Sequence, residues 1–491
     1  MMRIEEMLPS ILCLVVSIAA GSAWVGNAAS TLPAKQIERG FSATHDPSYS
    51  EFQPLLADPN GVFSLGFLRF NSTQLELAVL HLPSSLPVWR ANQARPALWT
   101  RSTSFSFNGT LVLSDPETGV IWSTPTAGGD RLVLLDSSNL QIQKLGDPVD
   151  VLWQSFDFPS DTLVQNQTFT SKAALLSTNR RYSMRLGSNY FALYMEVGED
   201  PSPMYWKHTA MEARAQIVPG EGSIYARVEP AGFLGMYQNE KAPVDVLPFD
   251  TFSRGISGLR RLTLEPDGNL RAYYWNGSTW VRDFTAITEP CGLPSTCGPY
   301  ELCSTGEPRC KCLDNSTDRC LPAGSGDLCA SEGDDFWVLR RKGVDLANKE
   351  LLGFQKVGSL AECEDSCERN CSCWGAVFNN ATGYCYGMDY PIGTVVEGDE
   401  GKVGYFKVRG NAGGGGREGA SAGKRTRAAL LVIGVVIFAG AAGFGAYQVR
   451  NRMRMRGGVD GSMTEGLAPG PYKDLSSASF RSIELSNSFK K

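Results

Sequence analysis

The sequence predicts a mainly β protein with small disulfide-bonded modules C-terminal to its β region and one membrane-spanning helix. Three observations lead to this fold class. Short β-prone runs separated by Asp, Pro, Gly and Asn recur from about residue 41 to 288. Twelve of the thirteen cysteines fall between Cys291 and Cys385. Two apolar segments lie near the ends of the chain.

The two apolar segments predict export and membrane anchoring. Residues 11–20 are an apolar run followed by small residues, which is too short for a bilayer and is typical of a signal peptide over 1–29. The alternative is a buried N-terminal helix. Residues 428–447 carry no charge and would cover ~30 Å as a helix at ~1.5 Å per residue. We therefore expect a single-pass plasma-membrane protein of type I, with an extracellular N-terminus and a cytoplasmic tail over 448–491.

Composition limits the function classes. The formal net charge is −5, so no general basic face favours a nucleic-acid partner. The three histidines are scattered, no P-loop occurs in the sequence, and the residues after the predicted membrane helix carry no kinase motif. The sequence therefore predicts no enzyme, no cofactor and no resident metal.

The cysteines are expected to form disulfides. Without Cys13, which leaves with the signal peptide, they form two groups of six, and an exported segment meets the oxidising conditions in which disulfides persist. A zinc site made of four thiolates is the alternative, and it lacks histidine support because none of the three lies near a cysteine group.

A capped helix is predicted around the densest cysteine cluster. Ser359 and Glu362 have the spacing of a capping box at a helix start. Cys363, Cys367 and Cys371 then recur every four residues, so their sulfurs should share one helix face and find partners elsewhere or beyond the helix end. The residues alone leave open the fifteen pairings that each group of six allows.

The β region predicts an internal threefold repeat. Trp89, Trp122 and Trp153 are 33 and 31 residues apart, each in a β-prone run. Three sheets, each donating strands and one core tryptophan, would satisfy this spacing. The stretch over 168–288 repeats the strand and turn pattern and predicts a second, divergent unit of the same kind.

Three motifs, in order, resemble a known plant family. VLWQSFDFPSDTL is similar to the end of the bulb-lectin domain, CGLPSTCGPYELCSTGEPRCKC to an EGF-like segment, and SLAECEDSCERNCSCWGAVFNN with GYC to a PAN/apple domain. Together they resemble the G-type lectin, S-locus glycoprotein and receptor-like family over roughly residues 41–409. The resemblance implies tandem β-prism (bulb-lectin-like) units, an EGF-like module and an α+β PAN/apple domain, without the family's kinase domain. The expected domains are the signal peptide 1–29, the bulb-lectin-like prism 41–165, the S-locus-glycoprotein-like unit 168–288, the EGF-like module 289–321, the PAN/apple domain 329–409, the Gly-rich linker 410–427, the transmembrane helix 428–447 and the tail 448–491.

The same resemblance implies a disulfide pairing that the residues alone do not choose. The implied pairs are Cys291 with Cys303, Cys297 with Cys310, Cys312 with Cys320, Cys329 with Cys371, Cys363 with Cys385, and Cys367 with Cys373.

Bulb lectins bind mannose through a Q-x-D-x-N-x-V-x-Y strand, and this chain keeps little of it. The comparable segments over 106–114 and 135–143 have lost most of the polar positions, which predicts a scaffold or protein-binding surface in preference to a mannose site. The best copy lies in the second unit, with Asp267, Asn269 and Tyr273 as candidate sugar ligands. Because Asp-Gly-Asn also suits a tight turn, a structural role competes with sugar binding.

Short motifs complete the expectations. Tyr472 and Leu475 fit a pattern that endocytic adaptors read. N-x-S/T sequons predict glycans at Asn71, Asn108, Asn166, Asn276, Asn315 and Asn380. We expect a cell-surface recognition receptor or co-receptor that binds an extracellular protein or glycan ligand and signals through a kinase-bearing receptor partner. The alternative is a mannose-type surface lectin in adhesion or defence.

Overall fold

The fold was analysed in a computed structural model. The structure describes residues 33–409 and residue 450, except 101, 197–201, 211–217, 219–221, 240–241, 307–308, 318–319, 322–327, 330–335 and 390–394. The predicted signal peptide, Gly-rich linker and transmembrane helix and nearly all of the tail, with Tyr472 and Leu475, lie outside the described residues. Within them, no helix is long and apolar enough to span a membrane.

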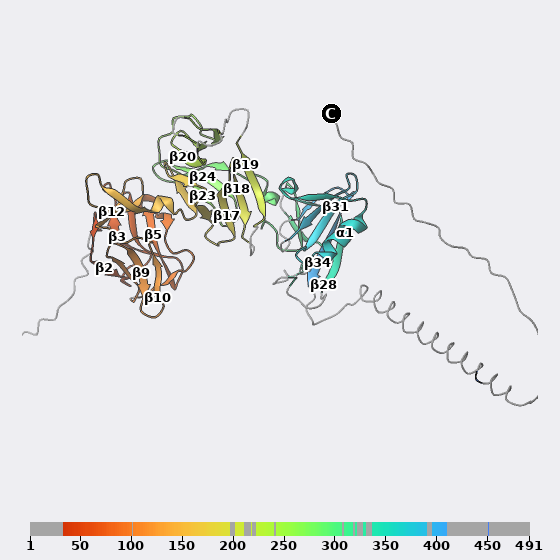
Figure 1. Ribbon diagram of the computed structural model, residues 1–491, viewed down its shortest axis with the longest axis horizontal. Coiled ribbons are helices and arrows are strands. Elements are labelled where there is room, and N and C mark those ends of the chain that lie inside the picture. Colours follow the sequence, from red (N-terminus) through yellow and green to blue (C-terminus); the bar gives the residue numbers. More distant parts are fainter. Residues whose placement is uncertain are drawn as a thin grey trace, which may run out of the picture. The chain divides into compact units, whose positions relative to one another are not determined.

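The first three-sheet unit (residues 37–154) consists of antiparallel sheets (Figure 1). Alternating buried and half-exposed residues, as in β8 and β9, give each sheet one core-facing side. One sheet has the order β3 (Phe52–Ala57), β4 (Phe63–Arg69), β5 (Gln74–His81) and β6 (Leu86–Arg90), with β7 (Ala97–Leu98) also pairing with β5. The second has the order β10 (Gly119–Ser123), β9 (Leu111–Asp115), β8 (Ser104–Phe107) and β2 (Phe41–Thr44). The third has the order β1 (Ile37–Glu38), β11 (Arg131–Leu134), β12 (Leu140–Lys144) and β13 (Asp150–Gln154).

The three tryptophans that predicted the repeat meet in this unit. Trp89, Trp122 and Trp153 come from β6, β10 and β13, one from each sheet. Their rings pack edge to face, with centroids 5.9 to 6.2 Å apart, which is a favourable geometry for aromatic pairs. The predicted threefold repeat with one tryptophan per sheet is confirmed.

The second three-sheet unit (residues 162–285) repeats this plan, again with one continuous apolar core. Its sheets have the orders β14-β23-β24-β25, β15-β20-β21-β22 and β16-β17-β18-β19. The bounds are β14 (Thr162–Val164), β15 (Thr168–Thr170), β16 (Ala174–Leu176), β17 (Tyr182–Leu186), β18 (Tyr190–Met195), β19 (Met204–Thr209), β20 (Tyr225–Glu229), β21 (Phe233–Tyr237), β22 (Asp245–Pro248), β23 (Arg260–Leu264), β24 (Leu270–Trp275) and β25 (Trp280–Thr285).

The strand pairing differs from the expected boundaries of the first unit, 41–165. β1 pairs with β11, so the sheets of that unit start at Ile37. β14 pairs with β23, about 100 residues later in the chain, so Thr162–Val164 belong to a sheet of the second unit. This exchange satisfies the backbone groups of β23, which would otherwise be the open edge of its sheet.

The C-terminal module (residues 290–409) contains two sheets and one helix, with its own apolar core. One sheet has the order β27 (Arg309–Cys312), β26 (Glu301–Ser304), β33 (Val395–Glu397) and β29 (Val344–Leu346). The other has the order β28 (Phe336–Lys342), β34 (Lys402–Arg409), β31 (Gly375–Asn379), β32 (Tyr384–Met388) and β30 (Phe354–Lys356). Because β26 pairs with β33, the segments expected as EGF-like and PAN/apple domains share a sheet.

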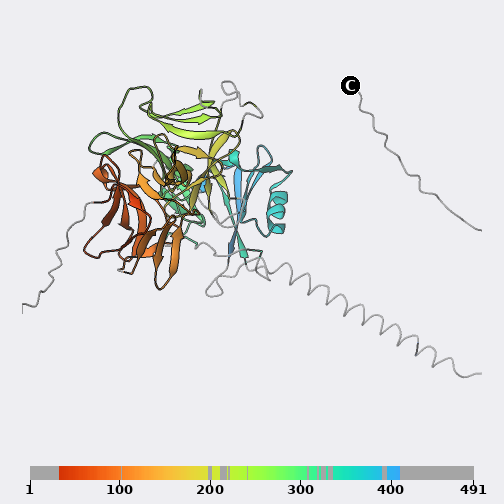
Figure 2. The same ribbon diagram turned by 60° about the vertical axis from the view of Figure 1, so that its left-hand side comes forward.

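Helix α1 (Leu360–Arg369) lies against β31 (Figure 2). It carries Cys363 and Cys367 of the dense cysteine cluster. Ser359 is the N-cap and accepts a hydrogen bond from Glu362 N (3.3 Å). The Glu362 carboxylate accepts from Gly358 N (2.8 Å), so the reciprocal bond of the capping box reaches one residue further back than expected. The helix ends at Arg369, so the expectation that Cys371 shares its face with Cys363 and Cys367 is wrong. The short 3₁₀ segments are η1 (Leu82–Ser84), η2 (Ser155–Asp157), η3 (Pro290–Gly292) and η4 (Lys349–Leu351).

Candidate carbohydrate strands and the cysteine framework

The side chain of Asn269 is buried in the second three-sheet unit, where it bonds to the backbone of another residue. It lies in the turn between β23 and β24, and only 1% of the residue is exposed. Its Nδ2 donates to Ile287 O at 2.7 Å, and its Oδ1 accepts from Ile287 N at 3.1 Å. Both ends of the amide are therefore used to tie this turn to the chain that follows β25, as buried polar groups require.

Asp267 and Tyr273 are also paired within the chain. Asp267 accepts from Arg271 at both carboxylate oxygens, at 3.0 and 2.6 Å, and from Asn269 N at 2.9 Å. Burial alone would raise the pKa of the Asp267 carboxyl, but these hydrogen bonds outweigh it and lower that pKa. The Tyr273 hydroxyl donates to Glu265 at 2.8 Å. Burial and this hydrogen bond raise the pKa of Tyr273 to about 12.

The structure thus brings the three candidate sugar ligands onto one turn and strand, but their polar atoms already have partners. A sugar hydroxyl could bind there only by displacing a bond of the fold. That exchange gives little net free energy, because each bond formed replaces one that is lost.

Polar side chains of the weakened motif in the first unit also bond within the fold. The Oδ1 of Asn139 accepts from Ser155 Oγ and Phe156 N, both at 3.3 Å, and its Nδ2 donates to Gln154 at 2.8 Å. Gln143 donates to Gln141 at 2.8 Å, and both residues are buried. On the other segment, Asn108 is exposed at the end of β8.

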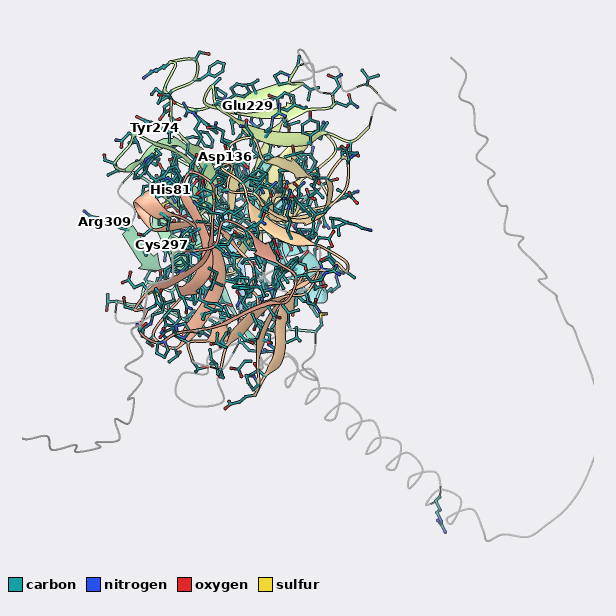
Figure 3. The ribbon with its side chains drawn as sticks, turned by 90° about the vertical axis from the view of Figure 1, so that its left-hand side faces the viewer. His81, Asp136, Glu229, Tyr274, Cys297 and Arg309 are labelled. Carbon is teal, nitrogen blue, oxygen red and sulfur yellow. A yellow bond between two sulfur atoms is a disulfide. The ribbon has the colours of Figure 1, made fainter. Side chains whose placement is uncertain are left out.

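The structure also shows a repeat that the sequence reasoning missed. On another sheet, Tyr237 donates to Glu229 at 2.7 Å, just as Tyr273 donates to Glu265 (Glu229 is labelled in Figure 3). Both glutamates precede their tyrosine by eight residues. The guanidinium carbons of Arg227 and Arg261 lie 4.8 and 4.3 Å from the ring centroids of Tyr237 and Tyr273. The eight-residue Glu-to-Tyr spacing was the available signal.

The third sheet keeps the tyrosine and the arginine without the glutamate. Tyr194 lies on β18, and the Arg185 guanidinium carbon is 5.1 Å from its ring centroid. By strand pairing, Gly187 stands at the position that Glu229 and Glu265 occupy on the other sheets. This sheet therefore lacks the carboxylate that accepts from the tyrosine hydroxyl on the other two.

Six disulfides hold the C-terminal module, and they join the same pairs that the family resemblance implied. They cover two clusters, one before and one around α1. Sulfur to sulfur distances lie between 1.92 and 2.01 Å for Cys291–Cys303, Cys297–Cys310, Cys312–Cys320, Cys329–Cys371, Cys363–Cys385 and Cys367–Cys373.

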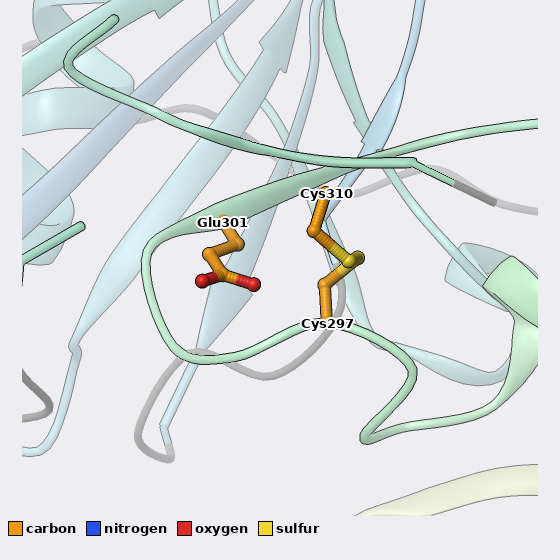
Figure 4. A group of neighbouring side chains, drawn as sticks. All are labelled: Cys297, Glu301 and Cys310. Atoms are coloured by element: carbon orange, nitrogen blue, oxygen red, sulfur yellow. A yellow bond between two sulfur atoms is a disulfide. The ribbon is translucent and has the colours of Figure 1, made fainter. Parts of the chain in front are cut away.

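One group of side chains has the composition of a metal site but different chemistry. Cys297, Glu301 and Cys310 lie close together (Figure 4). The two sulfurs are bonded to each other, and Glu301 accepts from Gly298 N at 2.7 Å. A disulfide offers no thiolate, so this group does not have the ligands that zinc binds.

The expected glycosylation sites lie on the surface. Each asparagine is exposed. The Oδ1 of Asn71 accepts from the Thr73 hydroxyl at 3.2 Å, and that of Asn276 from the Ser278 hydroxyl at 3.0 Å. These two sequons therefore form turns in which amide and hydroxyl are adjacent. The exposed residues are Asn71, Asn108, Asn166, Asn276, Asn315 and Asn380.

Comparisons with known proteins agree with this architecture. A D-mannose binding lectin family model matches residues 87–185, and an S-locus glycoprotein domain model matches residues 245–317. A PAN domain-containing protein of Arabidopsis thaliana is 45% identical over 460 residues, which is 92% of this chain and 93% of that protein. A G-type lectin S-receptor-like serine/threonine-protein kinase of the same plant is 28% identical over 90% of this chain and 56% of its own length. For another such kinase, also 28% identical, these shares are 68% and 44%.

Two solved lectin structures were also found. A Marasmius oreades lectin covers 26% of this chain and 92% of its own, with 19% identity and a TM-score of 0.19. A two-domain fetuin-binding agglutinin of Scilla campanulata covers 51% and 93%, with 18% identity and a TM-score of 0.18.

Taken with the two three-sheet units, the family models and the Arabidopsis relative define a plant protein of the lectin-like, S-locus glycoprotein class. The chain belongs to the G-type lectin and S-locus glycoprotein family, and it aligns with nearly the whole of the Arabidopsis PAN domain-containing protein. It spans about half the length of the receptor-like kinases that it matches.

Proposed function

We propose that this protein is a single-pass cell-surface glycoprotein that recognises an extracellular protein or glycan ligand and depends on a kinase-bearing receptor to signal. The observation that carries the proposal is the shared region with receptor-like kinases: 90% of this chain aligns with 56% of one of them. A chain with this region can compete with such a receptor for its ligand, or help the receptor to bind that ligand.

The geometry supports recognition in preference to chemistry. The polar side chains that the lectin motif would offer are committed to the fold, so recognition relies on surfaces around them. The disulfides suit this role, because cross-links limit the unfolded ensemble of a small module exposed outside the cell. In this proposal the shared sheet of β26, β27, β29 and β33 joins an EGF-like and a PAN/apple segment into one presenting module.

The test is cell-surface crosslinking of the full chain followed by identification of its neighbours. A kinase-bearing receptor recovered with the wild-type chain, and lost when residues 1–409 are exchanged for an unrelated exported domain, supports the proposal. Recovery of no such receptor, together with unchanged surface responses in cells lacking this chain, refutes it.

A mannose-binding surface lectin remains the second candidate, because the D-mannose binding lectin model matches residues 87–185. Retention of the chain on immobilised mannose distinguishes the two candidates.

A further inference from the structure

The second three-sheet unit has a surface hollow of about 350 Å³ on the sheet formed by β16, β17, β18 and β19. This volume is at the small end of ligand pockets, which range over about 300–1,000 Å³. Its lining includes Lys172, Arg185, Gly187, Tyr190 and Tyr194. None of the three candidate sugar ligands lies in it.

The strand register alternates small and long side chains next to the hollow. Ala174, Arg185, Ala192 and Lys207 lie side by side across the four strands, each paired with the next. The two alanines alternate with the two cations, so small side chains separate the long ones. Residues two apart on a strand share a face, so Tyr190 and Tyr194 stand on either side of Ala192.

The two tyrosines are fixed in place. The ring of Tyr190 lies against Gly187, where an added Cβ would come within 2.5 Å of the ring. The Lys207 ammonium is 4.2 Å from the centroid of the same ring. Burial, followed by the hydrogen bond to Tyr190, raises the pKa of Tyr194 above its usual range. The Tyr194 hydroxyl therefore stays protonated at neutral pH and can donate to a ligand.

The hollow is basic among the described residues. Arg185 donates to Glu196 at 2.7 Å and to Ser183 Oγ at 3.2 Å, and 38% of its side chain remains exposed. Lys172 and Lys207 are exposed as well. Lys172 and Arg185 are the charged residues of the lining, and Lys207 lies next to it against the Tyr190 ring, so these cations outnumber the one carboxylate of Glu196 and favour an anionic ligand.

The equivalent positions on the other two sheets carry a carboxylate that this sheet lacks. There, Glu229 and Glu265 accept from the tyrosine hydroxyls and place a negative charge beside the arginine. On this sheet the same register position is Gly187, which has no side chain. The aromatic and cationic residues are thus retained without a carboxylate at this position, and the carboxylate paired with Arg185 comes from Glu196.

We propose that this hollow binds an acidic saccharide: a uronate ring packs against Tyr190 and Tyr194, and its carboxylate pairs with Arg185 and the neighbouring lysines. Aromatic rings and hydroxyl donors suit a sugar ring, and a planar guanidinium suits a carboxylate. The site does not depend on the co-receptor role, since binding is measured on the isolated full chain without a partner.

Titration calorimetry of the full chain with digalacturonate, and with the neutral disaccharide galactobiose, tests this site. The wild type should bind digalacturonate with an affinity that falls as salt is added, and it should bind galactobiose at least tenfold more weakly. Tyr190→Ala should weaken digalacturonate binding roughly tenfold, since it removes one of the two rings against which the uronate packs. Lys172→Met, on an exposed side chain, should weaken it roughly two- to fivefold.

Tyr237→Phe is the matched control, because it alters the equivalent tyrosine where Glu229 occupies the hydroxyl. This variant should bind digalacturonate like the wild type. The circular dichroism of every variant is compared with that of the wild type, and Lys172→Met keeps the test decisive if Tyr190→Ala does not fold. Absence of digalacturonate binding at millimolar concentration, equal affinity for galactobiose, equal loss with Tyr237→Phe, or binding of a tyrosine-sulfated peptide in place of digalacturonate would each overturn the proposal.

Discussion

Replacing Asn269 with alanine should loosen the second three-sheet unit, because the amide of this residue bonds to the backbone in two places. Asn269→Ala removes the contacts to Ile287 O and Ile287 N, at 2.7 and 3.1 Å, and leaves both backbone groups buried without their side-chain partner. A buried group without a partner costs about 1–3 kcal/mol. The sum for the two groups, reduced by local relaxation, is about 2–4 kcal/mol.

Amide hydrogen exchange measures this loss locally, which suits a chain of several domains in which a single unfolding free energy is poorly defined. At about 1.4 kcal/mol per tenfold change, exchange at the Ile287 amide should accelerate roughly 30-fold or more in Asn269→Ala. The matched control is Asp267→Ala. Its side chain is 44% exposed, so loss of the ion pair with Arg271 and of the hydrogen bond from Asn269 N should together cost about 1–2 kcal/mol, less than the loss in Asn269→Ala. If the two variants accelerate exchange equally, Asn269 does not have the structural role assigned to it.

Three further predictions concern the C-terminal module. Removing Cys329–Cys371, with a sequence separation of 42, should cost about 4 kcal/mol, whereas removing Cys367–Cys373, with a separation of 6, should cost about 2 kcal/mol. Denaturation midpoints of the paired-alanine variants check the order, and a reversed order contradicts it. Lys407→Met should destabilise α1 by about 2–4 kcal/mol, because the buried ammonium donates to Cys367 O (2.8 Å) and Asn370 O (3.0 Å); unchanged exchange in the last turn of α1 would show the contacts to be dispensable. Burial opposes ionisation of Asp345, but hydrogen bonds from Lys349 and Lys402 lower its pKa below the unfolded value. The resulting stabilisation is present above about pH 4 and is lost as the pH falls through the lower folded pKa. Melting at pH 7, 5 and 3 should show this loss of stability in the wild type and a weaker loss in Asp345→Asn.

Much of the fold was predictable because its signals are local or periodic. The tryptophan spacing predicted the threefold repeat, since each sheet of the first unit carries one of these residues on an edge strand. The capping residue Ser359 fixed the start of α1, because a cap acts within one turn.

Features that depend on distant partners were not predictable. The end of α1 lies before Cys371 because Lys407, from β34, holds the carbonyls of the last turn. β14 joins a sheet of the second unit through β23, about 100 residues away, and no pattern in Thr162–Val164 predicts this pairing. The candidate sugar ligands were correctly placed together, but their pairing with Ile287, Arg271 and Glu265 became visible only in three dimensions.

Binding of the full chain to immobilised mannose, with a glycan array as readout of selectivity, tests the central claim most directly. The claim is that the lectin motif residues hold the fold and that recognition uses other surfaces. We predict no retention on mannose that free mannose can displace. Specific retention that is lost in Asp267→Ala while the exchange at Ile287 is unchanged would contradict the claim and establish a mannose lectin.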